Sequence, residues 1–355
     1  MARRSATPPP RTGAGLVMVC AWFAAACDVP TSPPEWETTW VVPGETVTIG
    51  VGSLLPDPLT VAGDRSAFLL DLDPTGVDRT LGEVCDACRP LDGTTAAKPA
   101  FSATFGSATD LPADVVSASV ASGTVEIRIT NGFNFDPVRP GGGATGTIVV
   151  VVTNGGRVIA TDTIDGATEG FPAGSVRTLV LDFAPGVVAG SIAVDVSIDS
   201  PAGDPVPIDI DQVIDVTATP GDVRLTQAEV AVADRVVEVE AAELDLEGVD
   251  DEVRDRIHGG AFRLAIANPF AVEGIVELTF ATPAATFEKA VALAQGESAP
   301  RVAFTRDELR ALAGRVVTFG GTGTVTAPSG TVTVTPSQTV TIDAELELVL
   351  GPKEE

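Results

Sequence analysis

Residues 146–164, "GTIVVVVTNGGRVIATDTI", hold two runs of β-branched residues on either side of Asn154-Gly155-Gly156. Enrichment in Val, Ile and Thr, with apolar residues recurring at a period of two, is typical of β-strands. Asn-Gly-Gly can adopt the positive φ angles that a tight hairpin turn requires. The stretch therefore predicts two adjacent antiparallel strands.

The same pattern recurs along most of the chain, in short runs that Gly, Pro, Asn and Asp interrupt. Further runs of this kind occupy residues 45–52, 124–130, 190–199, 234–246 and 330–350. Many short strands with few long helical patterns are typical of antiparallel sandwiches. We therefore expect an all-β protein with Ig-like sandwich architecture.

Helix signals are few. Thr305 and Glu308 have the spacing of a capping box, Leu309 and Leu312 can share one face of the helix that follows, and Gly314 can end it. Residues 250–257, "DDEVRDRI", indicate one or two helical turns. Both segments are expected to connect strands and not to form a helical layer.

An internal repeat relates residues 121–133, "ASGTVEIRITNGF", to residues 258–270, "HGGAFRLAIANPF". At one fixed offset the identical residues are Gly123 and Gly260, Ile129 and Ile266, Asn131 and Asn268, Phe133 and Phe270. Residues 200–216 and 327–342 follow in the same order, and each joins a Pro-x-Gly turn to a pair of strands. The repeat predicts two related units in tandem, with the join near residues 217–222.

The strand that ends in Asn268-Pro269 resembles the LEA14/WHy family of β-sandwiches, in which an exposed Asn-Pro pair follows an apolar strand near the start of the domain. The first copy has Gly132 where the family has proline, and both copies have phenylalanine where a second asparagine is usual. The resemblance covers only a short stretch in each copy. It implies a seven-strand sandwich without a catalytic centre, associated with stress tolerance or with binding, so each unit is expected to be Ig-like or LEA14-like.

The N-terminus has the layout of a secretory signal. Arg3, Arg4 and Arg11 precede an apolar run at residues 13–23, and three alanines then lead to Cys27. The apolar run is too short for a membrane-spanning helix, which needs about 20 residues. We expect the signal to be removed.

Ala24-Ala25-Ala26-Cys27 resembles the lipobox of bacterial lipoproteins, whose cysteine receives lipid on its sulfur and becomes the mature N-terminus. Ala24 departs from the family, which usually has leucine or another larger aliphatic residue there. An ordinary signal-peptidase site after Ala26 would give the same mature end without lipid. The resemblance implies lipidation of Cys27 and a place in the bacterial cell envelope, anchored to the outer membrane or to the periplasmic face.

These features divide the chain into five parts. The parts are a signal peptide (1–26), a lipidated N-terminus and tether (27–44), a first β-sandwich unit (45–221), a second β-sandwich unit (222–350) and an acidic tail (351–355).

The mature chain is strongly acidic. Removal of the signal takes away three arginines and no acidic residue, which leaves 19 basic and 49 acidic residues and a formal net charge of −30. Such a surface repels nucleic acid and favours solubility. The partners we expect are the membrane, through the N-terminal lipid, and other envelope proteins, whereas the sequence does not indicate an oligomeric state.

Cys85 and Cys88 form the C-x-x-C pair of "EVCDACRP". Two thiolates are half of a structural zinc site, but His258 is the one histidine of the chain and lies far away, so carboxylates or a second chain would have to complete it. A thioredoxin-like redox pair needs a strand-to-helix junction, whereas Pro90 follows here. Outside the cytoplasm a local disulfide that pins a loop is favoured over both.

Two acidic segments have some features of calcium sites. In residues 71–82, Asp71 and Asp73 stand at alternate positions, but Gly82 replaces the glutamate that closes a calcium loop. In "IDIDQVID", residues 208–215, Asp209 and Asp211 are expected on the solvated face of one strand. An acidic surface is the favoured interpretation of both segments and calcium is the alternative, so no metal site is predicted.

The sequence lacks the parts of common enzymes. It has one histidine, no tyrosine, no Gly-x-Ser-x-Gly motif and no glycine-rich phosphate loop before a helix. The absence of tyrosine also disfavours carbohydrate binding on aromatic platforms. Trp36 and Trp40 are expected to cover a sheet edge or to lie close to the membrane surface. We therefore predict no catalytic residue and no cofactor.

Two classes of function fit these observations. One is a non-enzymatic envelope lipoprotein with a structural or protein-interaction role. The other is an envelope lipoprotein that binds a lipid or another apolar molecule between the sheets of a sandwich. The two differ in whether a sandwich contains an apolar cavity large enough for such a ligand.

Overall fold

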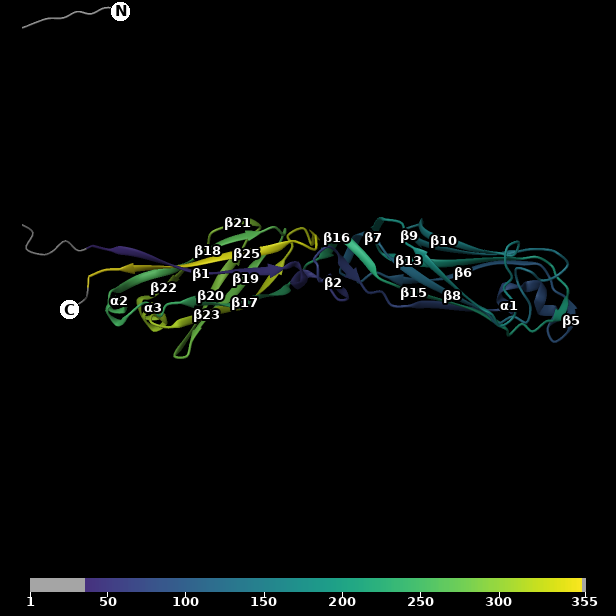
Figure 1. Cartoon of the computed structure of the whole chain (residues 1–355), viewed down its shortest axis with the longest axis horizontal. Helices are drawn as coiled ribbons and strands as arrows, with labels where there is room; N and C mark the ends of the chain where they lie inside the picture. The colour runs from purple at the N-terminus through teal and green to yellow at the C-terminus, as the bar shows by residue number, and fades with distance from the viewer. Residues whose placement is uncertain (1–35, 353–355) are drawn as a thin grey trace, which may run out of the picture. The chain divides into compact units, whose positions relative to one another are not determined.

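The computed structural model describes residues 36–352, and it is an all-β protein built from antiparallel sheets (Figure 1). One sandwich, called the first sandwich below, pairs the sheet β11-β8-β15-β4 with the sheet β10-β9-β13-β6. Its strands are β4 (Thr75–Thr80), β6 (Phe101–Asp110), β8 (Thr124–Asn131), β9 (Thr147–Asn154), β10 (Arg157–Asp165), β11 (Val176–Asp182), β13 (Ser191–Ser200) and β15 (Val213–Pro220).

The second sandwich pairs a sheet with the order β1-β25-β18, in which β21 and β22 both flank β18, with the sheet β17-β23-β19-β20. Its strands are β1 (Thr38–Gly50), β17 (Arg235–Asp245), β18 (Ile257–Asn268), β19 (Glu273–Thr282), β20 (Ala285–Leu293), β21 (Gly296–Ser298), β22 (Arg301–Phe304), β23 (Val316–Thr326) and β25 (Thr339–Leu350).

The two sandwiches have the same strand order. When the strands are numbered along each copy, with β21 and β22 taken together as one interrupted edge strand, every strand of the first copy has neighbours equivalent to those of the second. Thus β4 corresponds to β1, β8 to β18 and β15 to β25. The repeat that the sequence predicts is therefore present as a repeat of topology, with eight strand positions per copy.

The tandem arrangement predicted from the sequence is wrong. β1 pairs with β25 from Thr38 opposite Leu350 to Gly50 opposite Thr339, as the purple and yellow strands of Figure 1 show. Residues 38–44 are therefore strand and not tether, and residues 45–50 belong to the second sandwich and not to the first.

The first sandwich is thus inserted in the chain between β1 and β17, the first two strands of the second sandwich. The physical reason is that Val47 and Ile49 alternate into the core of the second sandwich, where they are buried. The predicted second unit, 222–350, lacks this strand.

A further sheet joins segments of both copies. Its order is β12-β7-β16-β3-β2, and β24 of the C-terminal part pairs with β16. The described residues from Glu37 onward form one compact unit, so the structure does not separate the two sandwiches into independent domains. The remaining strands are β2 (Leu59–Val61), β3 (Phe68–Leu70), β5 (Thr95–Ala97), β7 (Val115–Ser122), β12 (Gly186–Val188), β14 (Pro205–Pro207), β16 (Val223–Ala231) and β24 (Thr331–Val334).

The predicted hairpin at residues 146–164 is confirmed. β9 ends at Asn154, β10 begins at Arg157, and these two residues are register partners. Gly155 and Gly156 have φ angles of 56° and 82°, which a residue with a side chain adopts only with strain. Two such residues in sequence are typical of the type I′ turn.

The helices are short connectors, as expected. They are α1 (Leu81–Val84), α2 (Asp251–Asp255) and α3 (Arg306–Leu312), with 3-10 turns η1 (Val51–Leu54) and η2 (Asp86–Leu91). The predicted capping box of Thr305 and Glu308 is present at the start of α3. In residues 36–352 no helix is long and apolar enough to cross a membrane.

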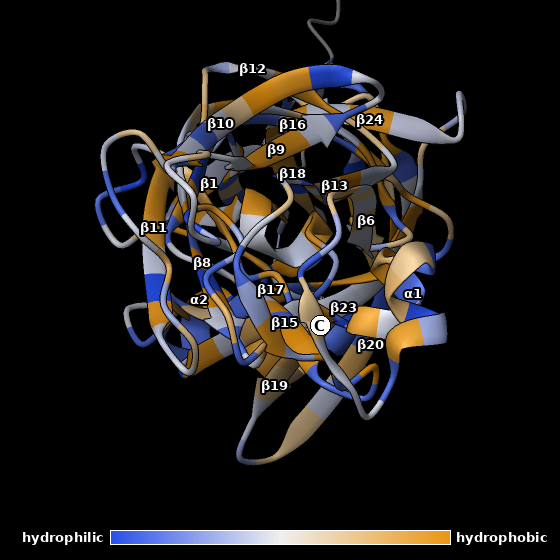
Figure 2. Cartoon of the chain, turned by 90° about the vertical axis from the view of Figure 1, so that its right-hand side faces the viewer, coloured by the Kyte–Doolittle hydropathy of each residue, from blue (hydrophilic) through white to orange (hydrophobic). Residues whose placement is uncertain are grey.

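Each core forms where the inward-facing residues of two sheets meet. In the second sandwich Phe262 of β18 packs edge-to-face on Phe280 and Phe319 of the opposite sheet, with ring centroids 4.8 and 5.1 Å apart. In the first, Phe101 of β6 meets Phe133, which follows β8, at 6.4 Å. Figure 2 shows orange, pale and blue residues following one another along the edge strands β10 and β11.

Candidate functional site

Two asparagines, Asn131 and Asn268, occupy equivalent corners of the two sandwiches. Each is the last residue of its strand, β8 or β18, and each is fully buried. The side-chain oxygen of each accepts a hydrogen bond of 3.0 Å from the backbone N–H two residues later, that of Phe133 or Phe270. The sequence repeat therefore corresponds to one local structure made twice.

The amide group of each asparagine donates to backbone carbonyls. Asn131 Nδ2 donates to the carbonyls of Phe135, Phe171 and Pro172 at 2.8 to 3.1 Å. Asn268 Nδ2 donates to those of Val272 and Ala294 at 3.1 and 3.0 Å. In both copies one acceptor lies four residues after the asparagine, so both side chains hold the turn that follows the strand and have no group left for a ligand.

Gly132 explains why the first copy lacks the proline of the second. Its N–H donates to the carbonyl of Val213 at 3.0 Å, and a Cβ at this position would collide with that carbonyl oxygen. Proline can supply neither the N–H nor the space. The departure from the Asn-Pro pattern therefore reflects a close approach of β8 to the start of β15.

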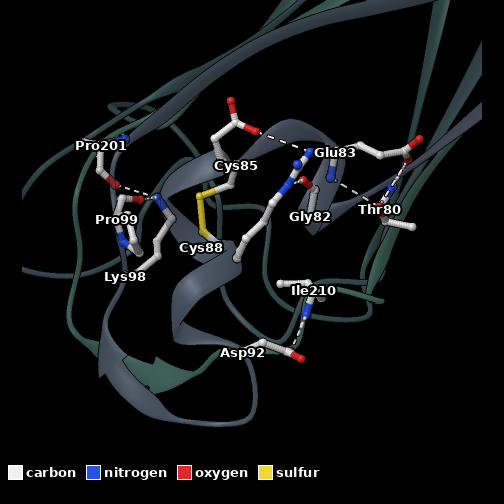
Figure 3. Close-up of a disulfide and its surroundings, with 12 residues drawn as sticks. Thr80, Gly82, Glu83, Cys85, Cys88, Asp92, Lys98, Pro99, Pro201 and Ile210 are labelled. Carbon is white, nitrogen blue, oxygen red and sulfur yellow. Dashed lines mark hydrogen bonds and ion pairs between the residues drawn. A yellow bond between two sulfur atoms is a disulfide. The ribbon is translucent and has the colours of Figure 1, made fainter.

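The disulfide cap, defined here as residues 80–98, lies between β4 and β6 (Figure 3). Cys85 and Cys88 are joined by a disulfide, with their Cα atoms 5.3 Å apart, and both residues are buried. Thr80 caps α1 through a reciprocal pair of bonds with Glu83. The bond from the Thr80 N–H, together with that from its hydroxyl, lowers the pKa of Glu83.

Several bonds tie the cap to the rest of the sandwich. The N–H groups of Leu81 and Gly82 donate to the carbonyls of Gln212 and Ile210 at 2.7 and 2.9 Å. The Ile210 N–H donates to Asp92 Oδ1 at 3.2 Å. Because the disulfide is buried inside this cap, a thiol reagent cannot reach it while the cap stays folded, and the arrangement suits a structural bond better than a redox centre.

Lys98 is the most unusual polar residue of the cap. Its side chain is 1 % exposed, and Nζ donates to the carbonyls of Pro201 and Pro99 at 2.5 and 3.0 Å. The ammonium group also lies 4.7 Å from the ring centroid of Phe101. Burial lowers the pKa of Lys98 to about 8, while the nearby Asp199 carboxylate acts in the opposite direction.

No sequence pattern signals the burial of Lys98, because a single lysine in "AAKPAF" belongs to no periodic pattern. The capping box of Thr80 and Glu83 was also missed, although its Thr-x-x-Glu spacing is readable. Both sets of residues hold backbone together, so neither indicates a reaction.

The four calcium candidates lie in two separate places. Asp71 and Asp73 precede β4, whereas Asp209 and Asp211 precede β15. β4 and β15 are antiparallel, so the two pairs lie at opposite ends of that strand pair. All four residues are exposed. Within residues 36–352 no three His, Cys, Asp or Glu side chains form a group that could hold a metal ion.

The strand predicted across residues 208–215 is wrong in its first half. β15 begins at Val213, and the residues before it form a turn. The carboxylate of Asp209 accepts a bond from the Asp211 N–H at 3.1 Å. This local bond competes with the ladder bonds of a strand, which is a general property of aspartate in turns.

The N-terminal lipidation candidate, Cys27, lies outside the described residues. Trp36 and Trp40 are described, and 73 % and 42 % of their surfaces are exposed.

The apolar cavity beside η1 tests the lipid-binding alternative. It has a volume of about 10 Å³, which is room for about one water molecule. An acyl chain does not fit there, so this cavity does not support a ligand held between the sheets. It is lined by Ile49, Ser53, Leu54, Val237, Phe270, Val272, Leu293, Val325 and Val340.

No protein-family model and no curated protein matches the chain. Among solved structures, it is similar to a protein of Parabacteroides distasonis described as secreted, with 11% identity, 88% of this chain and 99% of that chain covered, and a TM-score of 0.33. It is also similar to tandem CBM51 modules of a family 98 glycoside hydrolase from Streptococcus pneumoniae, with 7% identity, 86% and 99% covered, and a TM-score of 0.18. Both scores are too low to support an inference about function.

Proposed function

We propose that this chain is a lipid-anchored protein of the bacterial cell envelope, without enzymatic activity, whose sandwiches present strands and loops to other envelope proteins. One observation carries the proposal: the fold uses its buried polar side chains to hold its own structure. Five of these side chains donate hydrogen bonds to backbone carbonyls, and the sixth, a glutamate, forms ion pairs with two arginines. They are Lys98, Asn131, Asn154, Ser200, Asn268 and, with Arg263 and Arg301, Glu347.

Envelope attachment is supported by the signal-like N-terminus and the lipobox resemblance at Cys27. A mature chain with a formal net charge of −30 stays soluble outside its anchor and avoids binding to polyanions. Lipid at the N-terminus and an acidic folded part are compatible with a protein held at a membrane and exposed to the surrounding compartment.

A protein-interaction role is supported by the edges of the first sandwich. β10 and β11 are each the last strand of a sheet. Val158 of β10 and Val176 and Val180 of β11 are exposed on these strands. Edge strands carry backbone groups that can pair with a strand of another protein, and exposed valines add apolar contact to such a pairing.

The anchor is tested by Cys27→Ser in cells. The expected result is loss of fatty-acid labelling and accumulation of the uncleaved precursor, because lipoprotein processing requires the modified cysteine. Normal processing of this variant would remove the lipid anchor from the proposal.

The interaction role is tested by a photo-reactive amino acid placed at Val180 in cells. We expect a cross-linked protein adduct from this edge position. Thr318 is the matched control, because it is exposed but lies on β23 of the second sandwich, whose two neighbours are both occupied. Equal labelling from both positions, or none from either, would argue against recognition at this edge.

A further inference from the structure

Trp36, Trp40 and Val41, called the proximal apolar cluster here, are exposed large hydrophobic residues close together in sequence at the start of the described chain. Their exposed fractions are 73 %, 42 % and 51 %. In residues 36–352 the exposed large hydrophobic side chains are otherwise aliphatic and scattered over several strands. Three such residues within six consecutive positions form a concentration that single exposed valines do not.

The structure gives Trp40 a position that is neither core nor free coil. Trp40 lies opposite Leu348 in the β1–β25 ladder, two pairs from the end of that ladder at Thr38 and Leu350. Leu348 is buried, whereas almost half of the tryptophan surface remains exposed. Val41 is opposite Glu347 and is exposed as well. The ladder therefore fixes both residues on one edge strand, where their side chains point to opposite faces of the sheet and both stay exposed.

We infer that the proximal apolar cluster rests on the lipid–water interface of the membrane to which the chain is anchored. This inference rests on the lipid anchor of the proposed function. Trp36 lies nine positions after Cys27, a distance of at most about 30 Å when the chain is fully extended. A tryptophan places an apolar ring and a polar N–H at one site, which suits the boundary between headgroups and acyl chains.

The charge near the cluster decides which lipid surface it prefers. Between residues 36 and 50 the charged residues are Glu37 and Glu45, and no basic residue is present. Glu347, opposite Val41, forms ion pairs with Arg263 and Arg301. Because the mature chain has a formal net charge of −30, anionic headgroups repel it. We expect a surface of zwitterionic lipid to be favoured.

The chain is well suited to a direct test, because the two tryptophans of the mature sequence are Trp36 and Trp40 and tyrosine is absent. The lipidated full-length mature protein would be reconstituted into phosphatidylcholine vesicles, with or without bromine on the acyl chains. We expect a blue shift of the tryptophan emission on reconstitution and loss of most of the emission in brominated vesicles. Trp36→Phe and Trp40→Phe variants report on each side chain separately and keep an aromatic residue at each position.

Replacing part of the phosphatidylcholine with phosphatidylglycerol should weaken the quenching. Protein that floats with the vesicles but keeps a red-shifted, unquenched emission would overturn the inference and leave the anchor intact. A blue shift without quenching by brominated lipid would overturn it too, because the cluster would then contact protein.

A second preparation distinguishes failure of the lipid anchor from failure of the membrane contact. In it, the mature chain is coupled through Cys27 to a maleimide phospholipid. Cys85 and Cys88 are unavailable to the reagent while their disulfide is intact. Quenching in these vesicles supports the inference even where natural lipidation fails, and its absence overturns the inference.

Discussion

The two sandwiches share one strand order but fill the interval between their first two strands in different ways. In the first, residues 81–100 join β4 to β6, and most of them belong to the short disulfide cap. In the second, residues 51–234 between β1 and β17 contain the whole first sandwich. The comparison teaches that the same pair of strands can be joined by a short cap or by a whole folded sandwich.

The insertion lowers the free energy of unfolding of the second sandwich less than its length suggests. Lengthening a free loop about ninefold costs about 2 kcal/mol of closure entropy. The inserted segment is folded, and the pairing of β16 with β24 links it to the second sandwich, so its two ends do not behave as those of a free loop. The second sandwich therefore needs β1, a strand distant in sequence from the rest of its strands, to complete its sheet.

Removal of β1 should produce the largest effect. Residues 222–355 alone lack β1 and η1 and so leave Val47, Ile49, Val51 and Leu54 out of the core. At about 1.5 to 3 kcal/mol for each buried side chain, the loss is comparable with the whole stability of a domain, about 5 to 15 kcal/mol. We expect a largely unfolded polypeptide by circular dichroism.

The matched variant joins residues 38–55 to residues 235–352 through a Gly/Ser linker, which restores β1 without the first sandwich. We expect this polypeptide to give a β-type spectrum and a cooperative thermal transition. Equal folding with and without β1 would mean that the strand is dispensable.

Asn131→Ala and Asn268→Ala compare the two equivalent corners directly. Each leaves buried backbone groups unpaired, at about 1 to 3 kcal/mol per group. The two N–H groups of the Asn131 amide are shared among three carbonyls, and those of Asn268 serve two. We therefore expect a loss of about 4 kcal/mol for Asn131→Ala and about 3 kcal/mol for Asn268→Ala. Urea unfolding measures both, with Thr130→Ala as the neighbouring control. The reverse order would show that the hydrogen-bond inventory does not govern these corners.

Lys98 should make the stability of the first sandwich depend on pH in the alkaline range. Its folded pKa of about 8 lies below the ordinary 10.5, so the unfolded chain binds more protons between these values. Stability should therefore rise with pH from about 8 to about 10.5, by up to about 3 kcal/mol. The chain has no tyrosine to titrate in this window.

Lys98→Met should abolish this rise, because methionine has a similar volume and no ammonium group. Lys289→Met is the control for loss of one positive charge, since Lys289 lies in a partly exposed pair with Glu308. Urea unfolding at several pH values between 8 and 10.5 measures the slope. A slope that persists in Lys98→Met would contradict the assignment of the effect to this lysine.

The disulfide should have the smallest effect of the four. It closes a loop of only four residues, for which the chain-entropy relation gives about 2 kcal/mol. Cys85→Ala combined with Cys88→Ala should therefore lower stability modestly. Hydrogen exchange should increase in the cap and not at the corner of Asn268 in the second sandwich. Increased exchange at both sites would show that the cap stabilises the whole chain.

Local features of this fold were readable from the sequence, and long-range ones were not. Positive φ at Gly155 and Gly156 and the capping box at Thr305 follow from interactions within a few residues, and both predictions are confirmed. The strand nature of residues 45–50 was also evident from alternation. Its partner, β25, is distant in sequence, with Thr46 and Asp343 of the pair 297 positions apart, and no pattern within β1 identifies it.

The candidate sites show the same division. The Asn-x-Phe repeat marked two equivalent positions, where each asparagine bonds to the phenylalanine two residues later. It did not predict that both asparagines are buried, since the family that the strand resembles has an exposed Asn-Pro pair. The turn at Asp209 was mistaken for strand, since alternation of Ile and Asp does not reveal a side chain that bonds its own backbone. The burial of Lys98 depends on the carbonyl of Pro201, which only the tertiary fold brings close.

The nesting of one sandwich inside the other is tested most directly by a cross-strand disulfide in the full-length mature chain. Thr48 of β1 and Thr341 of β25 are register partners, and directly opposed strand residues are close enough for a disulfide bond. The control combines Thr48→Cys with Thr130→Cys. Thr130 lies on β8 of the first sandwich, and a tandem arrangement would place residues 45–52 in that sandwich. We predict rapid oxidation of Thr48→Cys/Thr341→Cys, and none within the control chain, as read by mass spectrometry of peptides; the opposite pattern would contradict the nested fold.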